Sequence, residues 1–176
     1  MLYVQVINKG YKRETDVRNV VAYAVGEHCQ CGLFGAQGLL AGTADSMFLS
    51  IMEEKREFSK DGGRMVLHII VSFDDCMKEY ITPEVALRIG YDICTACFPG
   101  FQVVFGVHDN TEHLHIHFVV NTVSYYTGKK FSRSVSEIWR MENVMEQIVS
   151  SYKSNNYEGT IDELHDLCGQ TSSNYN

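Results

Sequence analysis

The segment HDNTEHLHIHFVVN, residues 108–121, constrains the fold more than any other stretch of this chain. It holds four of the seven histidines within ten positions and then continues as an apolar run. Side chains alternate along a β-strand, so His113, His115 and His117 share one face, and the intervening apolar residues share the other. The pattern predicts a strand whose apolar face packs on the core and whose imidazoles stand together on the opposite face.

A second strand precedes this one in the sequence. The run FQVVFGV at 101–107 is rich in β-forming residues, and the turn-prone DNT at 109–111 separates the two runs. Together they predict an antiparallel hairpin. Same-face residues on a strand are about 7 Å apart, and a neighbouring strand adds side chains at similar range. His108, on the other side of the turn, can therefore complete a cluster with the three later histidines.

The remaining segments show strand and helix patterns in turn. Strands are predicted at 2–7 and within RMVLHIIVSF at 64–73, the latter as a buried central strand. Helices are predicted at 15–27, with Thr15 or Asp16 as cap, at 44–57, from Pro83 to the Pro99–Gly100 stop, and at 136–152. Residues 28–43 hold four glycines and are predicted to form a loop or a mobile flap.

This order of elements, βα(loop)αβαββα, predicts an α/β (α+β) fold. We expect a two-layer sandwich with a mainly antiparallel central sheet and helices packed on one side of it. At 176 residues and 45% hydrophobic content, the chain suits one globular domain. We expect that domain to span residues 1–155 and a polar tail to occupy 156–176, in either a minimal protein or part of a longer one.

Composition bounds the location and the partners. No apolar run approaches the ~20 residues of a membrane span, and the N-terminus lacks the pattern of a signal peptide. We therefore expect a cytoplasmic protein without membrane insertion, with its six cysteines as reduced thiols. The net charge of −7 argues against bulk, nonspecific binding of nucleic acid, because affinity for phosphates comes mostly from Lys and Arg. A local basic groove remains compatible with that charge.

Two chemistries fit the spacing of the histidines. Three neutral imidazoles that converge from adjacent strands suit a divalent transition metal with open coordination positions. The run HLHIHFV also fits the histidine-triad pattern of nucleotide hydrolases and transferases, in which the middle histidine, here His115, attacks phosphorus without a metal. Spacing alone does not choose between them.

The order of three segments resembles that of a known family. NVVAYAVGE at 19–27, HIIVSFDD at 68–75 and HDNTEHLHIHFVVN at 108–121 are similar to motifs I, II and III of the mobilisation relaxases of the VirD2 and MobA type, within the HUH endonuclease superfamily. The resemblance covers about residues 1–155 and includes the TPEVA helix start and the GKKFS segment. A histidine-triad protein would require neither the early tyrosine nor the HIIVSF strand.

This resemblance implies an activity. Such enzymes nick one DNA strand site-specifically at the origin of transfer of a plasmid or an integrative conjugative element, by transesterification. The position that matches the motif I nucleophile is Tyr23, whose attack would give a 5′-phosphotyrosine and a free 3′-hydroxyl. A tyrosine hydroxyl with a pKa near ~10 is a poor nucleophile at neutral pH, and a metal on the scissile phosphate helps by neutralising charge. The alternative nucleophile is His28, because one relaxase subgroup attacks through histidine.

The resemblance also implies which residues surround the metal. The matching ligands are His108, His115 and His117, and the ion would be Mn²⁺ or Mg²⁺, with other transition ions also suited to imidazole. Residues expected behind the ligands or in contact with DNA are His113, Asn121, His68 and Ser72. Candidate DNA contacts further along are Lys129, Lys130, Arg133 and the base-stacking pair Tyr125 and Tyr126.

The implied partner is single-stranded DNA at an origin of transfer, with an accessory DNA-binding protein and a coupling protein beside it. The acidic charge departs from the family, whose domains are commonly basic. Two alternatives stand next to the nickase. One is the nucleotide hydrolase, which rests on the histidine-triad pattern, and the other is a noncatalytic DNA-binding module with a relaxase-like fold, which the acidic charge supports.

Overall fold

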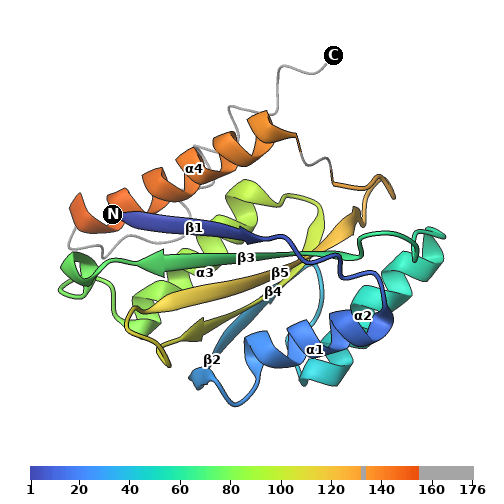
Figure 1. The fold of residues 1–176 in the computed structure, drawn as a ribbon, viewed down its shortest axis with the longest axis horizontal. Coiled ribbons are helices and arrows are strands. Elements are labelled where there is room, and N and C mark those ends of the chain that lie inside the picture. The colour runs from blue at the N-terminus through green and yellow to red at the C-terminus, as the bar shows by residue number, and fades with distance from the viewer. Residues whose placement is uncertain (132–133, 155–176) are drawn as a thin grey trace.

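Alternating β-forming runs build one antiparallel sheet in the computed structural model, which describes residues 1–131 and 134–154 (Figure 1). Within the described residues the sheet has five strands, in the order β1-β3-β5-β4-β2, and every neighbouring pair is antiparallel. The strands are β1 (Leu2–Ile7), β2 (Cys29–Gln37), β3 (Val66–Phe73), β4 (Phe101–His108) and β5 (His115–Ser124). The hairpin predicted from the histidine segment is the β4–β5 pair at the sheet centre.

Helices cover both faces of this sheet (Figure 1). They are α1 (Glu14–Val25), α2 (Ala44–Glu57), α3 (Pro83–Cys97) and α4 (Val135–Ser154), with a short 3-10 turn at Asp75–Met77. The predicted α+β class and the antiparallel central sheet are confirmed. The placement of all helices on one side is corrected, because the apolar stripes of α1 and α2 are buried against the second face.

Strand alternation divides the core into two parts. On one face, Ile69, Phe105 and Phe118 pack with the apolar stripes of α3 and α4. On the other face, Val104 and Val119 pack with those of α1 and α2. Helices α1 and α2 cover this second face, which is also the histidine face, and the histidines lie further along the same strands at the end of α1.

Strand β2 replaces the loop or flap predicted at 28–43. It pairs with β4 at the edge of the sheet, and its register shifts between Cys29 and Phe34. Gly35 shows why the alternation was hard to read: a Cβ at this position would overlap the rings of Phe105 and Tyr91. The glycine makes room for aromatic packing and removes the side chain that would have marked the strand.

The helix starts follow local chemistry. The predicted cap of α3 is confirmed, since the Thr82 hydroxyl accepts the N–H of Val85 and Pro83 occupies the first position. The predicted cap of α1 was wrong: Arg13 is the N-cap, and the carboxylate of Asp16 accepts its backbone N–H. Helix α1 therefore begins slightly earlier than its apolar pattern indicates.

Two predictions fall outside the part of the chain that the structure describes, namely the polar tail at 156–176 and the contact assigned to Arg133. Of the helices that are described, none is long and apolar enough to cross a bilayer.

Candidate metal centre

The register of β4 and β5 brings three histidines together. His108 and His115 are paired across the two strands, and His117 lies on the same face, in the next row. Their ring centroids are 4.5 to 5.5 Å apart. One ligand nitrogen from each lies within 4.8 Å of the other two, and all three side chains are buried. The structure thus groups the three histidines that the sequence nominated as metal ligands.

The end of α1 lies directly over this cluster. Gly106 shares the row of His117, and a Cβ there would overlap the carbonyl oxygen of Ala24. The same carbonyl lies 2.8 Å from Nε2 of His108. A carbonyl oxygen can only accept, so His108 donates from Nε2 and keeps its lone pair on Nδ1.

His115 is oriented by a second main-chain carbonyl. Its Nδ1 lies 2.8 Å from the carbonyl oxygen of His113, so Nδ1 carries the proton and Nε2 holds the lone pair. The side chain of His113 is partly exposed, with Nδ1 3.3 Å from the carboxylate of Asp75. His113 therefore supports the cluster through its backbone, and its imidazole lies outside the trio.

His117 is held by another imidazole. Its Nδ1 lies 2.8 Å from Nε2 of His68, whose Nδ1 in turn lies 2.8 Å from the hydroxyl of Tyr11. Burial, reinforced by Lys9 and His108, lowers the pKa of His68 to about 4. Burial among the other histidines lowers the pKa of His117 to about 2. Both rings are therefore neutral near pH 7, which is the form in which imidazole binds metals.

Two nitrogens of the trio are buried and have no hydrogen-bond partner among the described residues. They are Nδ1 of His108, on which the hydrogen bond to the Ala24 carbonyl leaves the lone pair, and Nε2 of His117. An unpaired buried polar atom costs about 1–3 kcal/mol. A divalent cation would satisfy both atoms, and three neutral imidazoles are a donor set suited to Zn²⁺, Mn²⁺ and related ions. The residues present therefore fit a metal ion.

Tyr23 lies at the rim of the cluster, in the last turn of α1. Its ring centroid is 5.1 Å from that of His117 and 5.5 Å from that of His108, and 42% of the residue is exposed. The exposed His28 lies next to Tyr23, with ring centroids 5.6 Å apart. Both nucleophiles considered from the sequence thus lie at one edge of the trio.

Asn121 does not join the cluster or reach the surface. It is fully buried, its amide nitrogen donates to Oε1 of Gln102, and its amide oxygen accepts the N–H of Val123. These contacts tie β4 to β5, so we expect a packing role in place of contact with DNA or a ligand. Ser72 lies nearer, since it pairs with His115 across β3 and β5 on the histidine face.

The later candidate DNA contacts lie at the far end of β5. From His115 to Ser124 the strand extends about 30 Å at ~3.4 Å per residue. The chain turns back at that end, where the rings of Tyr125 and Tyr126 are adjacent. The exposed Lys129 and Lys130 lie alongside the last residues of β5, with Lys130 bridged to Val123. The structure does not bring these residues to the trio, so a DNA strand that contacts them would have to extend along the sheet.

Sequence reasoning missed the role of Gly106 and the contact of Tyr11 with His68. A glycine inside the β-forming run FQVVFGV signals a close backbone approach, and that signal was available. Nothing local marks Tyr11, because 57 positions separate it from His68.

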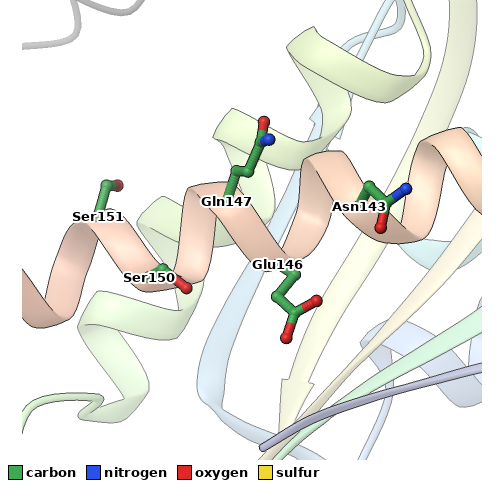
Figure 2. A pocket seen from close by; sticks show the side chains of 5 residues that line it. All are labelled: Asn143, Glu146, Gln147, Ser150 and Ser151. Carbon is green, nitrogen blue, oxygen red and sulfur yellow. The ribbon is translucent and has the colours of Figure 1, made fainter.

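The structure also has an open hollow of about 550 Å³ on α4, lined by Asn143, Glu146, Gln147, Ser150 and Ser151 (Figure 2). Helix α4 packs with α3 on the face of the sheet opposite the histidines. The described lining comes from one helix and contains a single ionisable group, so it offers no catalytic arrangement to compare with the trio.

Comparisons with known proteins point to one family. A family model described as the MobA/VirD2-like relaxase, nuclease domain, matches residues 23–154. Two Staphylococcus aureus proteins called Protein rlx are 29% identical over 72 residues and 31% identical over 74 residues. These alignments cover 41% and 42% of this chain but only 22% of each relative, so the matched region is about a fifth of their length.

One solved structure has the same fold. It is described as "Molecular Basis of Vancomycin Resistance Transfer in Staphylococcus aureus", and the match covers 90% of this chain and 96% of that chain with a TM-score of 0.59. The sequence identity is 10%, so this likeness concerns the fold alone.

Proposed function

Because this chain belongs to the relaxase family, as a MobA/VirD2-like nuclease domain, we propose that it nicks single-stranded DNA at an origin of transfer by transesterification through Tyr23. The observation that carries the proposal is the position of Tyr23 beside a buried trio of histidines, two of whose nitrogens have no partner in the described structure. The origin would belong to a plasmid or an integrative conjugative element.

The three histidines have a defined task in this reaction. Nδ1 of His108 and Nε2 of His115 and His117 would hold a divalent cation, which supplies positive charge at the scissile phosphate when bound. Mn²⁺ and Mg²⁺ are the candidates, and all-imidazole ligation favours the softer ion, Mn²⁺. Main-chain carbonyls fix the tautomers of His108 and His115, so the donor atoms of these two rings are arranged before the ion arrives.

Tyr23 performs the chemical step. Its Oη forms a bond to phosphorus while the bond from phosphorus to the 3′-oxygen breaks, and the phenolic proton ends on that 3′-oxygen, directly or through water. The products are a 5′-phosphotyrosine and a free 3′-hydroxyl, and the reverse step rejoins the strand. The partial exposure of Tyr23 supports this role, because a strand can approach it from solvent while the ligands stay buried.

Tyr23 is preferred to His28 as the nucleophile. The ring of Tyr23 lies against two of the three ligand histidines, whereas the described ring contact of His28 is with Tyr23 itself. The family match favours this chemistry over the nucleotide hydrolase with His115 as nucleophile. A noncatalytic DNA-binding module would have the same fold, and the adduct experiment below distinguishes it from a nickase.

The acidic charge of −7 bears on the partners. We propose that an accessory DNA-binding protein contributes affinity for the origin, and that a coupling protein receives the DNA-linked product. Action on an origin of transfer would place the protein in the cytoplasm.

The test uses a labelled single strand that carries the origin of the protein's own genetic element, with Mn²⁺. A protein–DNA adduct that survives denaturation is expected for the wild type and for His28→Ala, and is expected to be lost in Tyr23→Phe. Loss in His28→Ala with retention in Tyr23→Phe would assign the nucleophile to His28. Metal-independent cleavage of small nucleotides would support the hydrolase, and inertness toward both substrates would support the noncatalytic module.

A further inference from the structure

A line of hydrogen bonds runs from the cluster into the protein interior, through His117, His68 and Tyr11. Nδ1 of His117 is 2.8 Å from Nε2 of His68, and Nδ1 of His68 is 2.8 Å from the hydroxyl of Tyr11. All three side chains are buried. They come from β5, β3 and the segment between β1 and α1, so only the folded chain assembles them.

We propose that His68 and Tyr11 are positioning residues for the metal centre, which fix His117 in the tautomer that presents an Nε2 lone pair to the cation. This inference rests on the metal centre of the proposed function. It adds Tyr11 to that centre, chooses for His68 between the two roles expected from the sequence, and assigns the direction of each hydrogen bond.

Only one direction of hydrogen bonding is compatible with a bound cation. Nε2 of His117 must be unprotonated to bind, so the proton lies on Nδ1 and is donated to Nε2 of His68. A neutral His68 then carries its own proton on Nδ1 and donates it to Oη of Tyr11. In the opposite direction the Tyr11 hydroxyl would donate, and His117 would carry its proton on Nε2, where a cation could not bind.

The position of Tyr11 is built into the backbone. Its φ is 40°, in the left-handed region that residues other than glycine seldom adopt. Its carbonyl oxygen accepts the N–H of Met65, just before β3, at 3.0 Å. Its ring meets that of His68 edge-on, with centroids 6.0 Å apart and an interplanar angle of 74°. The fold therefore maintains an unfavourable backbone angle at Tyr11, the last residue of this hydrogen-bonded series.

The outer contact of His117 differs from those of the other two ligands. His108 and His115 are oriented by the main-chain carbonyls of Ala24 and His113, which substitution does not remove. His117 is oriented by a side chain. Nδ1 of His115 has a further contact with the Thr111 hydroxyl at 3.3 Å, but its main-chain partner remains when Thr111 is changed. The described partner of Nδ1 of His117 is a side chain, so a substitution at His68 removes it without changing a ligand.

The experiment measures the affinity of the full chain for Mn²⁺ by titration calorimetry. Loss of an outer partner of a metal-bound histidine lowers affinity about 10- to 100-fold. We expect a loss of about 10-fold for Tyr11→Phe and about 100-fold for His68→Leu, at the two ends of that range. His68→Gln should bind more tightly than His68→Leu, because the glutamine amide oxygen can accept the proton of His117. The control is Tyr3→Phe, an exposed tyrosine on β1, which should bind as the wild type does.

Two further measurements keep the test decisive. Thermal unfolding without metal shows whether each variant folds, and Tyr11→Phe removes a single hydroxyl. Nitrogen-15 NMR of the wild type loaded with Zn²⁺ should show His117 protonated on Nδ1 and metal-bound through Nε2. The proposal is overturned if folded Tyr11→Phe and His68→Leu bind Mn²⁺ as the wild type does, if Tyr3→Phe loses as much affinity as they do, or if His117 is protonated on Nε2 in the Zn²⁺ form.

The proposed function fails in a different way. A wild type that binds Mn²⁺ with the expected order of variants, but forms no DNA adduct, would contradict nicking and leave the positioning roles intact. A wild type that forms the adduct while Tyr11→Phe and His68→Leu keep full affinity would contradict the positioning roles alone.

Discussion

The ring of Tyr23 stands perpendicular to that of His117, with an interplanar angle of 90° and centroids 5.1 Å apart. This contact joins the end of α1 to β5 and is made by the face or edge of the aromatic ring, independently of the hydroxyl. The proposed nucleophile and the proposed ligand are therefore linked by packing. Their chemical tasks can be separated by a change that keeps the ring.

Tyr23→Phe should remove the DNA adduct, because the nucleophilic oxygen is lost. The affinity for Mn²⁺ should stay within about twofold of the wild type, because phenylalanine keeps the ring contact with His117. Adduct formation on a denaturing gel and Mn²⁺ titration on the same preparation check this. Parallel loss of both properties would mean that the hydroxyl contributes to the metal site, and would contradict the assignment of Tyr23 to the chemical step alone.

Gly106→Ala should disturb the site from beneath α1. An added Cβ would overlap the Ala24 carbonyl that accepts from His108, so α1 must move and that hydrogen bond must lengthen. Overpacking of this kind costs about 1–3 kcal/mol in the free energy of unfolding. Affinity for Mn²⁺ should fall as well, because His108 loses its orientation.

A matched control for this change is Gly62→Ala, where an added Cβ meets nothing within 4 Å. Denaturant unfolding and Mn²⁺ titration should leave Gly62→Ala close to the wild type. Equal stability of Gly106→Ala and Gly62→Ala would show that α1 does not press on β4 at this position.

Metal loading should stabilise the folded chain by mass action. A ligand that binds only the native state at a free concentration of 100 times its Kd adds about 2.7 kcal/mol to the free energy of unfolding. We expect this gain for wild type and for His113→Ala, because His113 supports His115 through its carbonyl. His117→Ala should abolish it. Thermal unfolding with Mn²⁺ and with EDTA measures the difference, and a gain that survives in His117→Ala would place the ion elsewhere.

The sequence predicted the parts of this molecule that depend on local periodicity. The apolar stripe of α2, the capped start of α3 and the histidine hairpin all follow from residues within one element. Strand β2 was missed because glycines such as Gly35 interrupt its alternation. The helices α1 and α2 were predicted, but their side of the sheet was wrong, because an apolar stripe does not say which face of a sheet it will cover. Contacts between segments far apart in the sequence determine both the pairing of β2 with β4 and the face that each helix covers.

The same distinction holds for the site. Alternation and the turn grouped His108, His115 and His117 because they lie on one hairpin, and the family resemblance supplied Tyr23. The contact of Tyr11 with His68 joins residues 57 positions apart and has no local signature. Lys129 and Lys130 follow motif III closely in sequence, yet an extended strand carries them away from the histidines, since each residue of β5 adds about 3.4 Å.

Lys55 gives the stability of the fold a pH dependence that is separate from the histidines. It is fully buried on α2, and its ammonium donates to the hydroxyl of Thr122 at 3.3 Å. Burial, reinforced by Lys130, lowers the pKa of Lys55 from 10.5 to about 7. Between these values the unfolded chain binds more protons than the folded chain, so the free energy of unfolding contributed by this residue rises with pH from about 7 to 10.5.

Lys55→Met keeps a long side chain in the same space and removes the charge. The pKa of Lys55 falls from 10.5 to about 7 on folding. At about 1.4 kcal/mol per pKa unit, the buried charge lowers the free energy of unfolding by on the order of 5 kcal/mol, and this loss is fully present below pH 7. Lys55→Met should therefore be more stable than the wild type by a few kcal/mol at pH 6, less the contribution of about 1 kcal/mol from the lost hydrogen bond. The two proteins should converge as the pH approaches 10.5. Denaturant unfolding across this pH range measures the difference, and Lys60→Met, at an exposed lysine, is the control. Parallel pH profiles for the wild type and Lys55→Met would show that Lys55 keeps an ordinary pKa in the folded chain.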